Sequence, residues 1–284
     1  MSDEATESPQ RSQPRILMCP PDHYAIEYEI NAWMDKSRQA DGELAMEQWK
    51  GLREKLEAAG AEILIVDPVQ GLPDMVFTAN AGLVHHEKVI LSRFRPEQRR
   101  GEEPLFQTWF EANSFDVTLV PEDTFFEGAG DALFCGDTLV AGYRQRSDAR
   151  GLQLLGELID CRVMPLELID PYYYHIDTCF CPMAPGVAMY FPGAFDDYGQ
   201  RVLRATVDEL IEIDADEAPH FAANAVVVGK TIVTNTGCEK LHGKLRAAGF
   251  DPVATPLSEF VKAGGSAKCL TLRLDGEEAA SWKY

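Results

Sequence analysis

Apolar runs alternate with polar and glycine-containing stretches along the chain, and their periods predict an α/β protein. Residues 15–21, RILMCPP, form a short apolar run that two prolines end, as is typical of a buried strand. Over residues 42–60, apolar side chains such as Trp49 and Leu52 recur near helical spacing, which predicts an amphipathic helix. AEILIVDP follows as a second buried strand. Helix followed by strand is the α/β signature.

One short segment recurs along the chain: a polar residue, one or two small residues, then an apolar run. The recurrences begin at Asn80, Asp131, Asp177, Asn224 and Cys269. Their spacings are 51, 46, 47 and 45 residues. A turn and a second apolar run follow the first four, so each predicts a hairpin whose first strand opens with a polar residue. A period of ~47 residues falls in the range of radial repeats, and chance similarity among hairpins of one large sheet is the alternative.

Helical patterns lie between the later hairpins, and they complete a repeating unit. They occupy residues 151–159 (GLQLLGELI), 201–211 (RVLRATVDELI) and 238–249 (CEKLHGKLRAAG). Units of this kind around an axis would place the strand-opening residues at one end of a central channel. We therefore expect one α/β-propeller domain over residues 15–284. Residues 1–14, rich in Ser, Pro, Glu and Gln, are expected to be a disordered tail.

Composition and charge narrow the class of protein. The 284 residues are 45% hydrophobic and 25% charged, as in soluble globular proteins, and the net charge is −20. That charge repels nucleic acid and anionic membranes. No apolar stretch reaches the 18 residues of a membrane span, and the polar N-terminus lacks the apolar core of a secretory signal. Seven cysteines without metal-ligand spacing indicate reduced thiols and a cytoplasmic protein. The oligomeric state stays open, a homo-oligomer included.

Four motifs at or near strand-opening positions carry candidate chemistry. They are PDMVFTAN from Pro73, FEGAGD from Phe126, YHIDT from Tyr174 and GGSAKC from Gly264. Taken alone, Cys269 could be an unreactive residue of the hydrophobic core, and His175 could have its hydrogen bonds satisfied by neighbouring residues. Glu127 could be a solvent-exposed acidic residue in a turn. The motifs occupy similar positions in their repeating units, and this favours one shared site.

Together these motifs supply a thiol nucleophile, an imidazole and several carboxylates. His175 and Asp177 stand two apart, so on a strand they would face the same side. Cys269 follows small residues, which let the backbone approach a ligand closely. A carboxylate-lined pocket suits a cation, and a planar guanidinium pairs with carboxylates through two hydrogen bonds. A thiolate with acid–base help can attack its carbon without a metal, so we expect no metal and no cofactor.

As a set, PDMVFTANAGL, FEGAGD, YHIDTCF and GGSAKCLT resemble the guanidino-group modifying superfamily. This superfamily includes arginine deiminases, dimethylarginine dimethylaminohydrolases, amidinotransferases and arginine dihydrolases. The resemblance extends over residues 15–274 and implies a five-bladed α/β propeller of ββαβ units, the pentein fold. The ~47-residue period points to the same architecture independently.

The resemblance also implies roles for individual residues. Cys269 is similar to the family's nucleophile, His175 to its general acid and base, and Glu127 to the carboxylate that orients this histidine. The substrate-binding positions of the family match Asp74, Asp177, Arg99 and Arg146. The two arginines would hold the α-carboxylate of the substrate, with Arg100 and Arg144 as alternatives one or two positions away.

Two asparagines distinguish members of the superfamily. Asn80, where deiminases carry an aspartate, is together with Asn31 similar to the arginine dihydrolases, which convert arginine to ornithine, carbon dioxide and ammonia. An amide can donate to and accept from a neutral ureido group, so citrulline could stay bound for a second attack. We therefore expect an arginine dihydrolase acting through a covalent thiouronium on cysteine. Dimethylargininase, arginine deiminase and amidinotransferase are the alternatives, and a non-catalytic guanidino-binding protein is the contrasting class.

Overall fold

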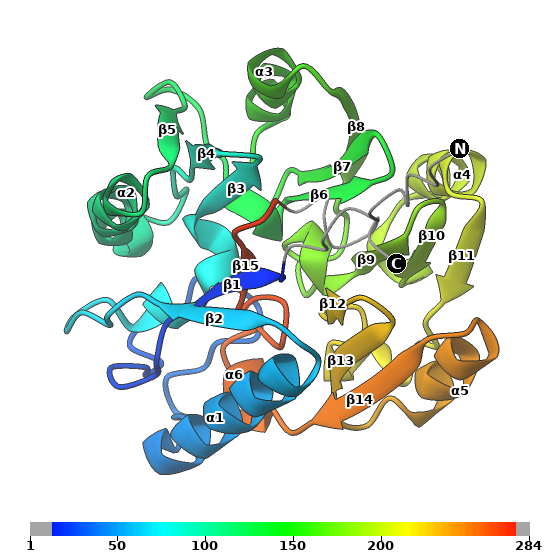
Figure 1. Ribbon diagram of the computed structural model, residues 1–284, viewed down its shortest axis with the longest axis horizontal. Coiled ribbons are helices and arrows are strands. Elements are labelled where there is room, and N and C mark those ends of the chain that lie inside the picture. Colours follow the sequence, from blue (N-terminus) through cyan, green and yellow to red (C-terminus); the bar gives the residue numbers. More distant parts are fainter. Residues whose placement is uncertain (1–12, 277–284) are drawn as a thin grey trace, which may run out of the picture.

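The computed structural model describes residues 13–276, and its strands form five three-stranded sheets around a central axis (Figure 1). The predicted tail, apart from residues 13–14, lies outside the described residues, as do residues 277–284. The predicted five-bladed α/β propeller is confirmed.

Four of the sheets follow one order along the chain: an antiparallel hairpin, a helix, and a third strand parallel to the second. The first comprises β3 (Gly82–His85), β4 (Lys88–Leu91), α2 (Glu103–Ala112) and β5 (Asp116–Leu119). The second comprises β6 (Ala132–Cys135), β7 (Thr138–Tyr143), α3 (Ala149–Ile159) and β8 (Arg162–Glu167). The third comprises β9 (Phe180–Ala184), β10 (Val187–Tyr190), α4 (Asp197–Thr206) and β11 (Glu209–Glu212). The fourth comprises β12 (Val226–Val228), β13 (Thr231–Asn235), α5 (Glu239–Ala247) and β14 (Asp251–Thr255).

The fifth sheet joins the two ends of the described chain. It comprises β15 (Leu272–Arg273), β1 (Arg15–Met18), α1 (Gly42–Ala58) and β2 (Glu62–Ile65). β15 pairs antiparallel with β1, with Leu17 opposite Leu272, and β1 pairs parallel with β2. Figure 1 shows β15 in red beside β1 in blue near the centre, so this pairing closes the ring.

The five long helices lie outside their sheets, and each buries its apolar side against them (Figure 1). In α1, Trp49, Leu52 and Leu56 are buried, while the Asp41 carboxylate caps the first turn by accepting from the N–H groups of Glu43 and Leu44. Short helices complete the fold: α6 (Ser258–Val261) and the 3-10 turns η1 (Pro73–Val76), η2 (Thr78–Ala81), η3 (Glu97–Glu102), η4 (Gly128–Gly130), η5 (Ile176–Thr178), η6 (Pro192–Ala194) and η7 (Ala218–His220).

Two local predictions are wrong. The predicted helix over residues 201–211 ends at Thr206, because Val207 turns the chain into β11. The residues predicted to open strands lie in tight turns just before them. His175 therefore precedes η5 and Asp177 lies within it, so strand alternation does not bring the two together.

Candidate active site

The turns before the innermost strands carry the five polar residues of the repeat, and hydrogen bonds join each to a neighbouring blade. Asn80 Nδ2 donates to Glu127 O at 3.2 Å, and Asp131 Oδ1 accepts from Ile176 N at 3.3 Å. Asn224 Nδ2 donates to Asp177 O at 3.0 Å, and its Oδ1 accepts from Cys269 N at 3.1 Å. Ala79 N donates to Cys269 O at 3.1 Å. The chemistry-bearing residues are thus held by a ring of contacts around the axis.

The Cys269 thiol is buried beside a carboxylate. Its Sγ lies 3.4 Å from Asp177 Oδ2 and 3.1 Å from Asn224 Nδ2. Burial, followed by the charge of Asp177, raises the pKa of the thiol well above its usual value. The thiol is therefore protonated in the ligand-free site, and a cation bound beside Asp177 would favour the thiolate.

His175 and Glu127 form a buried pair, as the sequence predicts. His175 Nε2 lies 2.7 Å from Glu127 Oε2, which also accepts from Arg146 Nη1 at 3.1 Å. Burial opposes ionisation of Glu127, but the charge of Arg146 and the bond to His175 outweigh it and lower the pKa of this carboxyl to about 2. A fixed anion thus orients the imidazole.

Arg99 contacts Asn80 and lies beside two carboxylates, those of Glu102 and Asp74. It makes a two-pronged ion pair with Glu102, at 2.9 and 2.8 Å, and donates from Nη1 to Asn80 Oδ1 at 2.9 Å. Both oxygen and nitrogen of the Asn80 amide are therefore engaged. A Cβ on Gly130 would lie 2.2 Å from Asn80 Nδ2, so this glycine lets the amide reach the Glu127 carbonyl.

Asp74 is a buried carboxylate beside the same arginine. Its Oδ2 is 4.0 Å from Arg99 Nε. Burial raises the pKa of Asp74, with Arg99 and the Tyr28 hydroxyl opposing the shift. Within residues 13–276, Asp74 Oδ1 makes no hydrogen bond. A buried oxygen of this kind suits a donor on a bound ligand.

These groups surround one cavity with about 260 Å³ of empty space. Its lining includes Cys269, Asp74, Asn80, Arg99, Arg146, Tyr174 and Asn31. Tyr174 donates to Gly264 O at 2.7 Å, and its ring stacks with the Arg146 guanidinium at 4.7 Å. The structure thus brings the predicted nucleophile and five of the six predicted substrate residues together around one space, while Asp177 contacts the thiol without lining it.

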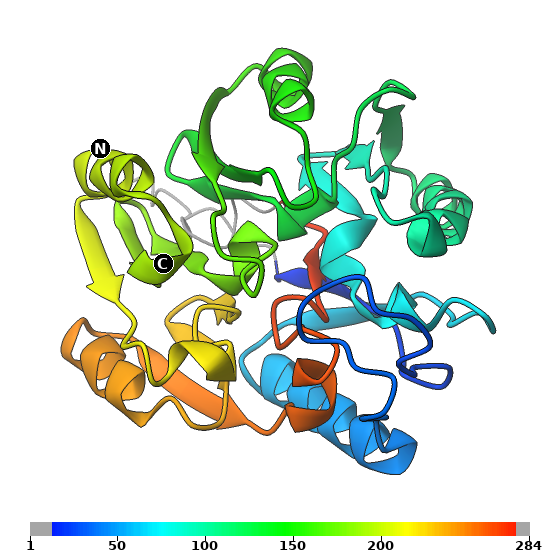
Figure 2. The ribbon, with the colours of Figure 1, turned by 180° about the vertical axis from the view of Figure 1, so that it is seen from behind.

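The segment between β1 and α1 covers part of this cavity, in blue in Figure 2. Asn31 Nδ2 donates to Ala263 O at 3.0 Å, and its Oδ1 accepts from the backbone N–H groups of Trp33 and Met34. Arg146 Nη2 donates to Ile30 O at 2.9 Å. Asn31 therefore lines the cavity while its amide holds the covering segment in place.

The structure distinguishes the alternative arginines. Arg144 is exposed and pairs with Glu167 at 2.7 Å, and Arg100 stands beside Glu97 and the Phe125 ring. Neither lines the cavity, whereas Arg99 and Arg146 do.

The glycine-rich approach to Cys269 is tightly packed. Gly264, at φ +83°, fits between Trp33 and Tyr174, and a Cβ on Gly265 would lie 2.5 Å from the Phe77 ring. Its small residues therefore serve close packing against aromatic rings.

Sequence reasoning missed several residues that position the site. Asp131 accepts from Ser147 Oγ at 2.6 Å, and Ser147 Oγ accepts from Glu127 N at 3.0 Å, so the pair fixes the Glu127 backbone. Burial, only partly opposed by His175, raises the pKa of Asp131 to about 6. The repeat spacing singles out Asp131 and Asn224, but no motif marks Glu102 or Ser147.

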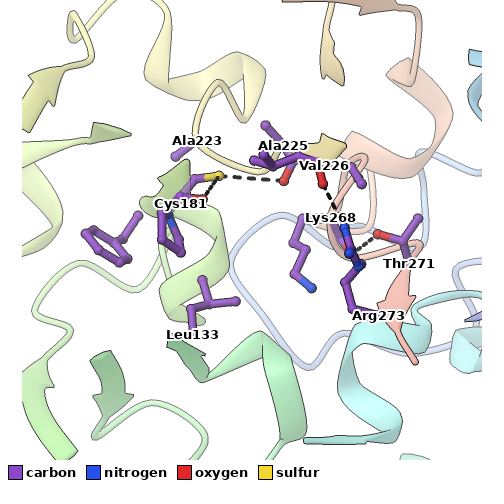
Figure 3. A pocket seen from close by; sticks show the side chains of 11 residues that line it. Leu133, Cys181, Ala223, Ala225, Val226, Lys268, Thr271 and Arg273 are labelled. Carbon is purple, nitrogen blue, oxygen red and sulfur yellow. Dashed lines mark hydrogen bonds between the residues drawn. The ribbon is translucent and has the colours of Figure 1, made fainter. Parts of the chain in front are cut away.

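A second cavity, with about 400 Å³ of empty space, lies further along the innermost strands (Figure 3). Apolar residues such as Leu133 and Val226 line it, together with Lys268, Thr271 and Arg273. Lys268 thus faces one cavity and the next residue, Cys269, the other.

All seven cysteines are free thiols. Within residues 13–276, no three metal-binding side chains cluster, and no helix is long and apolar enough to cross a membrane. The expectation that no metal or cofactor is needed stays a prediction.

Five blades surround an axial cavity that Cys269, Asp74 and two arginines line. Asp177 lies beside the thiol, and Glu127 joins His175 to Arg146. This arrangement defines the guanidino-group modifying class that the motifs resemble. The model of the family described as N,N dimethylarginine dimethylhydrolase, eukaryotic, matches residues 18–275, and the chain belongs to this family.

Curated relatives include arginine dihydrolases and dimethylarginine dimethylaminohydrolases. The chain is 49% identical over 265 residues to the bifunctional arginine dihydrolase/ornithine cyclodeaminase ArgZ of Synechocystis sp., covering 92% of this chain but 37% of that protein. It is 36% identical over 270 residues to the N(G),N(G)-dimethylarginine dimethylaminohydrolase of Mycobacterium tuberculosis, covering 94% of this chain and 89% of that protein. This chain thus spans about two fifths of the ArgZ length.

Crystal structures of the ArgZ N-terminal domain superimpose closely on this fold. A cysteine-to-serine mutant bound to substrate gives a TM-score of 0.90 at 47% identity, covering 93% of this chain and 98% of that one. An asparagine-to-serine mutant covalently bound to a reaction intermediate gives 0.89 at 48% identity, covering 92% and 97%.

Proposed function

We propose that this protein is an arginine dihydrolase, which hydrolyses arginine to ornithine, carbon dioxide and ammonia with Cys269 as nucleophile. The observation that carries the proposal is the buried thiol 3.4 Å from Asp177, in one cavity with Asn80 and two arginines. The arginines are paired with Glu102 and Glu127, and two further acidic side chains, Asp74 and Asp177, lie beside Arg99 and the thiol. Such a site favours a cationic guanidinium.

The first hydrolysis uses groups that already lie in place. Asp74 and Asp177 hold the guanidinium, and its charge favours the Cys269 thiolate, whose proton passes to His175. Sulfur attacks the guanidinium carbon, His175 protonates the departing ammonia, and a thiouronium remains on Cys269. Water, deprotonated by His175, then adds to that carbon, and the C–S bond breaks to give citrulline. Because Glu127 engages Nε2 of His175, these protons pass through Nδ1.

The second hydrolysis repeats the chemistry on the ureido group of bound citrulline. Sulfur displaces the second ammonia, water releases the carbamate of ornithine, and this loses carbon dioxide. Citrulline is neutral at its ureido end, so it must be retained without the guanidinium charge. The uncharged amide of Asn80, where a carboxylate would favour the cation, supports this step.

The relatives support the proposal. The ArgZ domain, similar over nearly its whole length, is an arginine dihydrolase seen with substrate and with a covalent intermediate. We infer that Arg99 and Arg146 hold the substrate α-carboxylate, and that the enzyme works in the cytoplasm, where thiols stay reduced.

Product analysis tests the proposal. Purified protein is incubated separately with arginine, citrulline, agmatine and asymmetric dimethylarginine, and amino acids and ammonia are quantified. We expect about two ammonia molecules per ornithine from arginine. Citrulline as the sole end product would identify a deiminase, transfer to an added amine an amidinotransferase, and binding without turnover a guanidino-binding protein.

Dimethylargininase is the second candidate, because the family match and the Mycobacterium tuberculosis relative both carry that activity in their names. It requires space for two methyl groups beside the thiol. Release of dimethylamine far faster than consumption of arginine would favour this function over the dihydrolase.

A further inference from the structure

The Asn224 side chain makes two hydrogen bonds to Cys269. It lies at the fourth repeat position, before β12, and its side chain is fully buried. Its Nδ2 donates to Cys269 Sγ at 3.1 Å, while its Oδ1 accepts from Cys269 N at 3.1 Å. One amide thus fixes both the backbone and the sulfur of the nucleophile.

This geometry determines the orientation of the Asn224 side-chain amide. Because Oδ1 accepts from a backbone N–H, and Nδ2 also donates to Asp177 O at 3.0 Å, the amide cannot be flipped without losing these bonds. Nδ2 therefore presents an N–H to sulfur whether the thiol is protonated or ionised. A hydrogen bond to an ionised acceptor is roughly twice as strong as one to a neutral acceptor, so this contact favours the thiolate.

The thiol needs such a donor because its other surroundings disfavour ionisation. Burial and Asp177 raise its pKa, while the backbone at Ser266 and the Asn224 amide oppose the shift. The remaining ionisable groups of the cavity and adjoining turn are Asp74, Arg99, Arg146, Tyr174 and His175.

We propose that Asn224 is a further catalytic residue, whose amide stabilises the Cys269 thiolate through an N–H···S hydrogen bond. This inference rests on the proposed role of Cys269 as nucleophile. A purely structural asparagine would affect folding but not the titration of the thiol.

Alkylation of Cys269 tests the proposal without using arginine. Neutral iodoacetamide reacts with thiolate, so its rate against pH follows ionisation, and peptide mass spectrometry separates Cys269 from the other six cysteines. Asn224→Ala removes the donor, and Asn224→Asp also adds a negative charge. Asn235→Asp is the matched control, because Asn235 is likewise buried and bridges His220 O and Leu257 N away from the cavity.

We expect the alkylation midpoint to rise by about one pH unit in Asn224→Ala, which slows the reaction about tenfold below the midpoint. The shift should be larger in Asn224→Asp and absent in Asn235→Asp. Midpoints equal to that of the wild type in both Asn224 variants would overturn the proposal.

A wild-type measurement covers the case in which the variants do not fold. In protein labelled with ¹⁵N-asparagine, one side-chain amide should shift with the thiol titration, and none should do so in Cys269→Ser. Absence of such a resonance contradicts the proposal. If Cys269 titrates as expected but arginine is not consumed, the proposed function fails and the role of Asn224 stands.

Discussion

The site contains two groups of residues that differ in whether their charges are balanced within the protein. Arg99 and Arg146 each lie against a buried carboxylate, Glu102 and Glu127, so their charges are balanced within the protein. Cys269 and Asp177 lie against each other, and burial, together with the charge of Asp177, raises the pKa of the thiol. The arginine pairs are complete without substrate, whereas the thiol side favours ionisation only when a cation arrives.

This difference would determine the orientation in which the substrate binds in the site. In the proposed function, the arginines bind the substrate carboxylate while they keep their ion pairs with Glu102 and Glu127, and the thiol side binds the guanidinium. A molecule with a carboxylate at one end and a guanidinium at the other fits both. It also explains how a high thiol pKa is compatible with catalysis: the substrate supplies the charge that ionises its own nucleophile.

The largest expected effect concerns the thiol side. Cys269→Ser should lower arginine turnover by at least about 10⁴-fold, because an alcohol ionises far less readily than a thiol. The fold should persist, since serine is close in size and can still accept from Asn224. Steady-state kinetics and thermal unfolding measure the two effects. An unfolded variant, or activity near that of the wild type, would contradict the assignment of the nucleophile.

The next effect concerns the balanced arginine side. Glu127 has an ordinary pKa of 4.5 that the fold lowers to about 2, so its contribution to stability is present above pH 4.5 and is lost as the pH falls towards 2. Its size is about 3 kcal/mol. Glu127→Gln should be less stable than wild type by that amount at pH 7, and the gap should narrow between pH 4.5 and 2.

Urea unfolding at several pH values measures this gap. Asp131, whose pKa is raised to about 6, changes stability in the opposite sense, but it is present in both proteins and its effect largely cancels in the difference. A gap independent of pH would show that Glu127 is not held ionised by Arg146 and His175.

A third, smaller effect tests the orientation in which the substrate binds. Agmatine lacks the carboxylate that the arginines are proposed to hold, so its kcat/KM should be about 100-fold below that of arginine, or about 2.7 kcal/mol. Arg146→Lys should reduce this preference. The exposed Arg144→Lys is the matched control and should keep it. Equal use of both substrates by the wild type would remove the arginines from carboxylate recognition.

The sequence predicts the repeat and most of the site, for a physical reason. Each blade has an apolar first strand preceded by a polar residue at constant phase, so Asn80, Asp177 and Cys269 can be placed from the period alone. The family motifs add His175 and Glu127. The tight turns carrying these residues have no periodicity of their own, so the sequence predicts strands where the structure has turns.

Other features depend on contacts that no local pattern encodes. The fifth blade needs β15 to pair with β1 from the opposite end of the chain. Glu102 and Ser147 look like ordinary polar residues until folding places them against Arg99 and Asp131. Arg144 and Arg146 are two positions apart, and only folding shows that Arg144, at φ 97°, is exposed while Arg146 is buried.

The smallest expected effect concerns Asn80, which lies between the two groups. Its Oδ1 accepts from Arg99 and its Nδ2 donates to Glu127 O. Asn80→Asp keeps the first contact, loses the second and adds a negative charge to the cavity. The charge favours cationic arginine over neutral citrulline, so citrulline should leave before the second hydrolysis.

A loss of ~1.4 kcal/mol in citrulline retention shifts the ornithine-to-citrulline ratio about tenfold towards citrulline. The ratio is measured during the first turnovers of wild type and Asn80→Asp, with Asn235→Asp as a control for replacing a buried amide. An unchanged ratio in Asn80→Asp would mean that the neutrality of Asn80 does not retain citrulline. The segment held by Asn31, which covers part of the same cavity without adding charge, would be the next place to test.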